Sequence, residues 1–104
     1  MVRHMSEAAL QAIAEPRRRE ILRLVRDRPH SVNEIAERFD ISQQAVSQHL
    51  KVLREAGLVT VQPSGQRRLY AIRTEGLESV RELLAELWPA RLAELKRVVE
   101  DDRC

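Results

Sequence analysis

Residues 31–57 limit the possible folds of this chain more than any other stretch, because they predict two short helices joined by a tight turn. The tetrapeptide SVNE at 31–34 matches a capping box, in which the serine caps a helix and the glutamate reaches back to the cap. The pattern predicts a helix over 32–39, with its apolar residues facing inward.

A second helix is predicted directly afterwards. Ser42 is a typical N-cap residue, and Gly57 is a typical residue for the position after a helix end, so the helix should cover 43–56. Two helices joined by a turn of three or four residues form a helix-turn-helix unit.

At about 100° per residue, the second helix separates into two faces. Its apolar residues fall on one side, together with His49, for which a buried or half-buried position is favoured over a metal ligand. The opposite side is polar and mostly neutral or basic: Gln43, Gln44, Ser47, Gln48, Lys51, Arg54 and Glu55.

Such a polar face is typical of a helix that enters the major groove of DNA. Its first turns carry Ser and Gln, which hydrogen-bond to base edges, and Lys51 and Arg54 follow at positions suited to phosphates. The alternative is an ordinary solvated surface.

The rest of the chain adds helices before this unit and a hairpin behind it. Apolar spacing predicts helices over about 7–14 and 16–27, a β-hairpin over about 58–72, and a C-terminal helix or kinked pair over about 75–102, with Pro89 inside that pattern. The predicted fold is mainly α with a β-hairpin wing, an α+β winged helix-turn-helix forming one domain over 1–104, in which 1–5 form a flexible tail.

Basic residues gather at the predicted tip of the hairpin. The tip carries Gly65, Gln66, Arg67 and Arg68, which suit contact with a DNA backbone or minor groove, although a solubilising charged turn is the alternative. Residues 1–73 have a net charge of +5 and residues 74–104 one of −3, so a polyanion should meet only the front of the chain.

The combined pattern resembles the ArsR-type winged helix-turn-helix repressors. The resemblance rests on AVSQHLKVLREAGLV and GQRRLYAI, supported by PRRREILRLV at 16–25 and SVNEIAERFDIS at 31–42. It implies a homodimer that binds a palindromic operator and represses its own operon. It also implies dimerisation through the first and last helices, here 6–14 and 75–102. The implied DNA-binding residues are Ser42, Gln43, Gln44, Ser47, Gln48, His49, Lys51, Arg54, Gly65, Gln66, Arg67 and Arg68.

The chain departs from the metal-sensing members of that family. The segment 31–39 holds no cysteine and residues 74–103 hold no histidine, whereas divalent metals prefer those ligands. We therefore expect no metal and no other cofactor. The single cysteine, Cys104, excludes a disulfide within the chain and fits a reducing cytoplasm, and no apolar run is long enough to predict a membrane span.

The apolar residues of the last segment exceed what a small core can cover, which favours a dimer. The predicted interface residues are Leu10, Ile13, Leu84, Leu87, Trp88, Leu92 and Leu95.

The sequence favours a DNA-binding repressor, with a small-molecule effector as a possible further partner. A winged-helix module for protein–protein contact, with little DNA specificity, is the alternative. An enzyme is not expected, because no nucleophile with a base, phosphate loop or metal cluster is present in the sequence.

Overall fold

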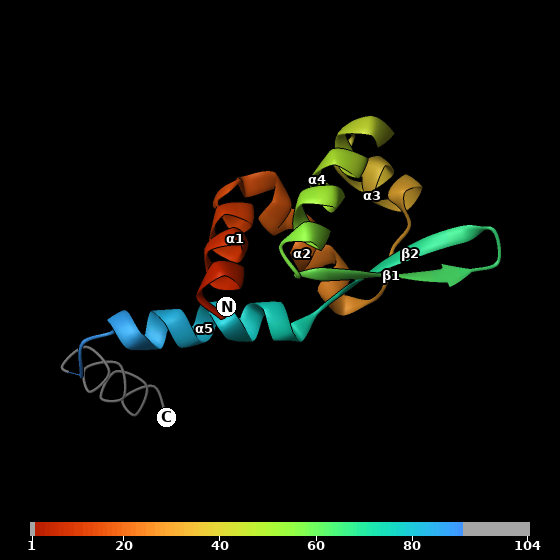
Figure 1. The fold of residues 1–104 in the computed structure, drawn as a ribbon. Helices are drawn as coiled ribbons and strands as arrows, with labels where there is room; N and C mark the ends of the chain where they lie inside the picture. Colours follow the sequence, from red (N-terminus) through yellow and green to blue (C-terminus); the bar gives the residue numbers. More distant parts are fainter. Residues whose placement is uncertain (1, 91–104) are drawn as a thin grey trace, which may run out of the picture.

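The computed structural model describes residues 2–90 of the 104-residue chain (Figure 1). This part holds five helices and one two-stranded antiparallel sheet, so the predicted α+β winged helix-turn-helix fold is confirmed. The elements are α1 (Val2–Ala14), α2 (Pro16–Asp27), α3 (Val32–Phe39), α4 (Gln43–Glu55), β1 (Val59–Ser64), β2 (Arg67–Ile72) and α5 (Thr74–Leu87).

The core is built mainly by aliphatic side chains of α2, α3 and α4, and α1, β1 and α5 add further buried residues to it. Removing a side chain of this size from water contributes roughly 2 kcal/mol, so these contacts hold the helix-turn-helix unit together. The largest fully buried side chains are Ile21, Val25, Ile35, Val46, Leu50, Leu53 and Leu58.

The predicted helix caps of the central unit are confirmed. Ser31 and Glu34 form the capping box of α3, and the Ser42 hydroxyl oxygen accepts a hydrogen bond from the Ala45 N–H at 3.0 Å. Gly57 ends α4 with a φ of 78°, and the Leu58 N–H donates to the Leu53 carbonyl at 2.9 Å. This is a Schellman ending, which explains why α4 stops at Glu55, one residue before the predicted end.

The predicted start of the first helix was wrong. Helix α1 begins at Val2 rather than near residue 7, so residues 2–5, expected in a tail, belong to the helix. Helix α5 begins at Thr74, one residue before its predicted start, and Arg73 is its N-cap residue without a capping side-chain hydrogen bond.

Pro89 lies just beyond the end of α5. The helix ends at Leu87, and Trp88 takes an extended conformation, as the residue before a proline usually does. A single kinked helix running through Pro89 is therefore wrong. Most of the remaining predicted range, including Leu92 and Leu95, lies outside the described residues, as does Cys104.

The hairpin projects from the end of the helical body that carries α3 and α4 (Figure 1). Its register runs from Val59 opposite Ile72 to Ser64 opposite Arg67. The loop between α2 and α3 also joins the sheet at one point, because the backbones of His30 and Tyr70 exchange two hydrogen bonds of 3.0 and 2.8 Å. The hairpin base is thus fixed to the helix-turn-helix unit.

Helices α1 and α5 pack against each other, and α5 extends away from the hairpin (Figure 1). Gly76 brings the start of α5 against the end of α4, where a Cβ at that position would lie only 2.2 Å from the Gly57 carbonyl oxygen. Among residues 2–90, no helix combines the length and apolar character that crossing a lipid bilayer requires.

Candidate nucleic-acid interface

The exposed face of α4 carries the polar side chains that were predicted to face DNA. Within the described part of the chain, these side chains form no hydrogen bond or ion pair, so their donors and acceptors are open to a ligand. They are Gln43, Gln44, Ser47, Gln48, Lys51 and Arg54.

The opposite face of α4 anchors the helix. Val46, Leu50 and Leu53 are buried, so the orientation of the polar face is set by the core. Val52, expected on the inner side, is 38% exposed because it lies at the edge of the apolar arc, one helical step from Leu53. His49 is half-buried, as the angular placement predicted.

Ser42 differs from the other side chains of α4 that were predicted to contact DNA, because it already caps the helix. Its hydroxyl oxygen accepts the Ala45 N–H, which satisfies one of the free donors at the start of α4. The side chain remains exposed at the end of the helix where anions are attracted by the helix dipole.

The wing turns through two residues, Gly65 and Gln66, so Arg67 and Arg68, expected at the tip, belong to β2. Gly65 has a φ of 64°, a conformation that costs other residues energy, and nothing lies within 4 Å of where its Cβ would be. Gln66 and Arg68 are exposed and form no hydrogen bond or ion pair with the described residues.

Arg67 lies differently from its neighbour Arg68. Its guanidinium turns back onto α3, where one nitrogen lies 2.8 Å from Glu34 Oε1 and 3.4 Å from the Ser31 hydroxyl oxygen. The structure therefore separates two adjacent arginines that the sequence placed together at a DNA-contacting tip.

Glu34 is the centre of a cluster of charged side chains, which its position in the capping box did not predict. Besides capping α3, its carboxylate pairs with Arg67 and lies 3.5 Å from Arg28. The hydrogen bond from the Ser31 backbone lowers the pKa of Glu34 below its ordinary value. Partial burial opposes this shift, and the Ser31 side chain, Arg67 and Arg28 support it. The sequence could have indicated this cluster only through Arg67, which reaches Glu34 because the folded hairpin returns to α3.

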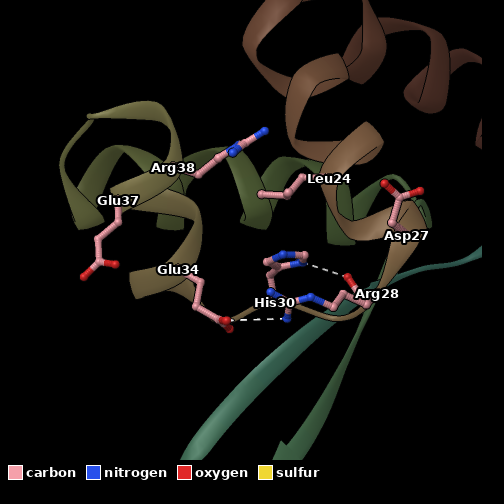
Figure 2. A pocket seen from close by; sticks show the side chains of 7 residues that line it. All are labelled: Leu24, Asp27, Arg28, His30, Glu34, Glu37 and Arg38. Atoms are coloured by element: carbon pink, nitrogen blue, oxygen red, sulfur yellow. Dashed lines mark hydrogen bonds and ion pairs between the residues drawn. The ribbon is translucent and has the colours of Figure 1, made fainter.

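An open groove of about 600 Å³ lies beside Glu34, between the end of α2 and α3 (Figure 2). His30 is only 5% exposed, and its Nδ1 donates to the Arg28 carbonyl at 2.7 Å, so the ring is held in place. The lining mixes both charges: Leu24, Asp27, Arg28, His30, Glu34, Glu37 and Arg38. Within residues 2–90, no three His, Cys, Asp or Glu side chains gather in a group able to hold a metal.

Five of the predicted dimer residues lie on α1 or at the end of α5, and the other two, Leu92 and Leu95, lie outside the described residues. Leu84, Leu87 and Trp88 are 47%, 70% and 50% exposed at the end of α5, and Leu10 and Ile13 of α1 are half-buried.

A family model described as "Bacterial regulatory protein, arsR family" matches residues 15–61, which span α2 to β1. The HTH-type transcriptional regulator Rv2034 of Mycobacterium tuberculosis is 36% identical over 96 residues, which cover 92% of this chain and 90% of that protein.

Two further relatives carry names that give opposite directions of control. The transcriptional activator HlyU of Vibrio cholerae is 38% identical over 79 residues, covering 76% of this chain and 73% of that one. The transcriptional repressor SdpR of Bacillus subtilis is 35% identical over 68 residues, covering 65% and 76%.

A solved structure adds an assembly state for one relative. It is the homodimeric winged helix-turn-helix DNA-binding domain (fragment 1–100) of Mb0332 from Mycobacterium bovis, a possible ArsR-family transcriptional regulator. The two superpose with a TM-score of 0.67 at 28% identity, covering 95% of this chain and 81% of that one.

Proposed function

The chain belongs to the arsR family of bacterial regulatory proteins, and from that premise we propose that it is an autoregulatory repressor that binds a palindromic operator as a homodimer. It is a transcriptional regulator with a winged helix-turn-helix DNA-binding domain, and its relatives are regulators rather than enzymes. The polar face of α4, whose side chains have no partner among the described residues, is the observation that carries the proposal.

We assign base recognition to the first turns of α4. Gln44, Ser47 and Gln48 have neutral donors and acceptors free of partners in the described chain, and a glutamine pairs bidentately with adenine. Gln43 and His49 flank this group, with His49 the less exposed. Ser42 and the helix N-terminus meet a phosphate.

Backbone contacts are assigned to basic side chains around these readers. Lys51 and Arg54 lie one and two turns further along α4, and Arg68 extends from the wing beside Gly65 and Gln66. Contacts of this kind position the protein on DNA without reading its sequence.

Homodimerisation is proposed through α1 and α5. The exposed Leu84, Leu87 and Trp88 form an apolar end that a second copy would cover, and the homodimeric relative supports the same assembly. A two-fold axis then presents two copies of α4 about 34 Å apart, one turn of DNA. Repression is proposed because blocking a promoter needs only operator binding, and SdpR is a named example.

The test compares binding to the chain's own promoter region with binding to a random duplex at the same salt concentration. Gln44→Ala and Gln48→Ala should each cost about 1–3 kcal/mol on the operator and little on random DNA. Lys51→Ala should weaken both and reduce the salt slope by about one. Equal affinity of the intact protein for both duplexes would favour a protein–protein module instead.

We further propose that no metal acts as the inducer. Zinc, nickel or arsenite added to the complex should leave operator affinity unchanged. Release of the DNA by any of them would contradict this part of the proposal.

A further inference from the structure

Arg67 connects the wing to the start of α3 across a long stretch of chain. Its guanidinium lies 2.8 Å from Glu34 Oε1 and 3.4 Å from the Ser31 hydroxyl, although 33 and 36 residues separate the partners. This is the only ion pair between the wing and the helix-turn-helix unit within the described residues.

The Glu34 carboxylate that pairs with Arg67 is also held by groups outside the wing. Oε1 of Glu34 also accepts the Ser31 backbone N–H at 2.9 Å, as part of the α3 cap, and Oε2 lies 3.5 Å from Arg28 (Figure 2). Because the cap orients the carboxylate, Arg67 binds a preformed acceptor rather than ordering a free side chain.

The second strand of the wing is therefore held at two separate points. Its backbone pairs with His30 at Tyr70, and its Arg67 side chain holds the strand three positions nearer the tip. A single point would leave the hairpin free to pivot about Tyr70, whereas two points define its direction relative to α3. Since α3 and α4 share one core, the direction relative to α4 is defined as well.

We propose that Glu34 is a positioning residue for DNA recognition, which holds the wing through Arg67 so that Arg68 and Gln66 meet DNA at a set angle to α4. In this assignment the exposed Arg67 side chain contacts α3 of its own chain, which replaces its predicted role as a DNA contact. The inference rests on the DNA-binding function proposed above.

Holding the wing raises affinity through preorganisation. An isolated exposed ion pair contributes little to folding, so the value of this pair lies in the orientation it imposes. A wing whose orientation is already fixed loses less conformational entropy when it binds DNA. Releasing it should therefore weaken operator binding by about five- to tenfold without removing a phosphate contact.

The decisive experiment is a double-mutant cycle on operator affinity with Glu34→Gln and Arg67→Gln. Glutamine is accepted at this position of a capping box, so Glu34→Gln removes the charge and keeps the cap. Each single variant should weaken binding by about five- to tenfold, and the double variant should bind no more weakly than either, because both release the same contact.

Arg68→Gln is the matched control, since its side chain has the same charge and no partner among the described residues. It should add its effect fully to that of Glu34→Gln and reduce the salt slope by about one. Arg67→Gln should leave the slope unchanged. A slope reduced by Arg67→Gln, with effects that add to those of Glu34→Gln, would show that Arg67 grips a phosphate and would overturn the proposal.

A measurement on the free protein separates this inference from the proposed function. Backbone amide order parameters of Gly65 and Gln66 should fall in Glu34→Gln and Arg67→Gln and stay at the native value in Arg68→Gln. Unchanged values in all three would refute the positioning role even if operator binding is specific. If the intact protein does not prefer its operator, the same comparison still decides whether the wing is held. Arg67→Gln leaves both residues of the capping box, Ser31 and Glu34, in place and serves alone if Glu34→Gln does not fold.

Discussion

At the scale of single residues, the run Arg17-Arg18-Arg19 shows how one side chain can serve a neighbouring element. Three positive charges at the start of α2 oppose the dipole of that helix. The structure explains two of them, because Arg18 Nε donates to the Ala12 carbonyl at 2.6 Å and an Arg19 nitrogen donates to the Ile13 carbonyl at 2.7 Å, whereas Arg17 pairs with Glu20. The charges of Arg18 and Arg19 complete the C-terminal end of α1, where unpaired carbonyls favour cations.

Loss of Arg18 should therefore destabilise the fold more than loss of another α2 arginine. Arg18→Ala removes a charged donor from a partly buried carbonyl, which should lower the free energy of unfolding by about 1.5–3 kcal/mol. Urea unfolding at fixed protein concentration measures the change. Arg23→Ala, at an exposed position without a partner among the described residues, should stay within about 0.5 kcal/mol. Equal losses in both variants would contradict the capping role.

Glu34 contributes to the stability of the fold in a way that depends on pH, and its surroundings determine the sign of that dependence. Its folded pKa lies below the ordinary value, so its contribution to stability is fully present above the unfolded pKa. The contribution is lost as the pH falls through the folded pKa, where protonation ends the pairing with Arg67 and Arg28. Asp27, His30, Glu37 and Arg38 line the same groove as Glu34.

The difference in unfolding free energy between the native chain and Glu34→Gln should thus shrink as the solution is acidified. It should be largest above the ordinary pKa of a glutamate and approach a constant below the folded pKa. Unfolding curves from neutral pH downward measure this difference, and the remaining carboxylates cancel because both proteins carry them. A difference that grows on acidification would contradict the assigned sign.

At the scale of elements, local sequence signals predicted the centre of the molecule and failed at its ends. Short-range hydrogen bonds set where α3 and α4 begin and where α4 ends, and they involve Ser31, Ser42 and Gly57. Residues of these types are recognisable in the sequence as cap residues. The early start of α1 has no such signal, because that helix is stabilised by packing against α5. The turn of Arg67 towards Glu34 was hidden for the same reason: it depends on two segments that meet only in the fold.

Gly76 is an element-scale feature, since it allows α5 to touch the end of α4. Gly76→Ala at an ordinary helix position should stabilise by up to about 1 kcal/mol. Here the new Cβ would lie 2.2 Å from the Gly57 carbonyl oxygen, a backbone atom that cannot rotate away. We expect a loss of about 1–3 kcal/mol from the forced displacement of α5. Thermal or urea unfolding decides between these opposite signs, and a gain in stability would show that the close contact is absent.

At the scale of the whole molecule, we propose that the two ends of the described chain serve different functions, DNA binding and dimerisation. Helix α4 and the wing lie at one end, and the C-terminal part of α5 lies at the other (Figure 1). The exposed face of α4 is polar, whereas the exposed Leu84 and Leu87 of α5 are apolar. Gly76 and Gly57 form the junction between them, so the direction of α5 is fixed relative to α4. A dimer formed through α5 would therefore determine the spacing of two recognition helices without any contact between the wings.

Leu87→Glu tests that division of tasks. Leu87 is 70% exposed in the single chain, and its burial in a symmetric dimer would count twice, so the substitution should cost roughly 4 kcal/mol of association energy. The dimer dissociation constant should rise by about a thousandfold, as measured by sedimentation equilibrium over a range of concentrations. Operator affinity should fall with it, because a monomer contacts only one half-site.

Glu82→Gln provides the matched control on the same helix, at an exposed position about 160° around α5 from Leu84. It should leave both the dissociation constant and operator affinity near their native values. If Leu87→Glu remains dimeric and binds its operator normally, the end of α5 is not the interface, and the spacing of the recognition helices must be set by another surface. If it becomes monomeric yet keeps full operator affinity, recognition needs only one copy of α4, and the palindromic operator is excluded.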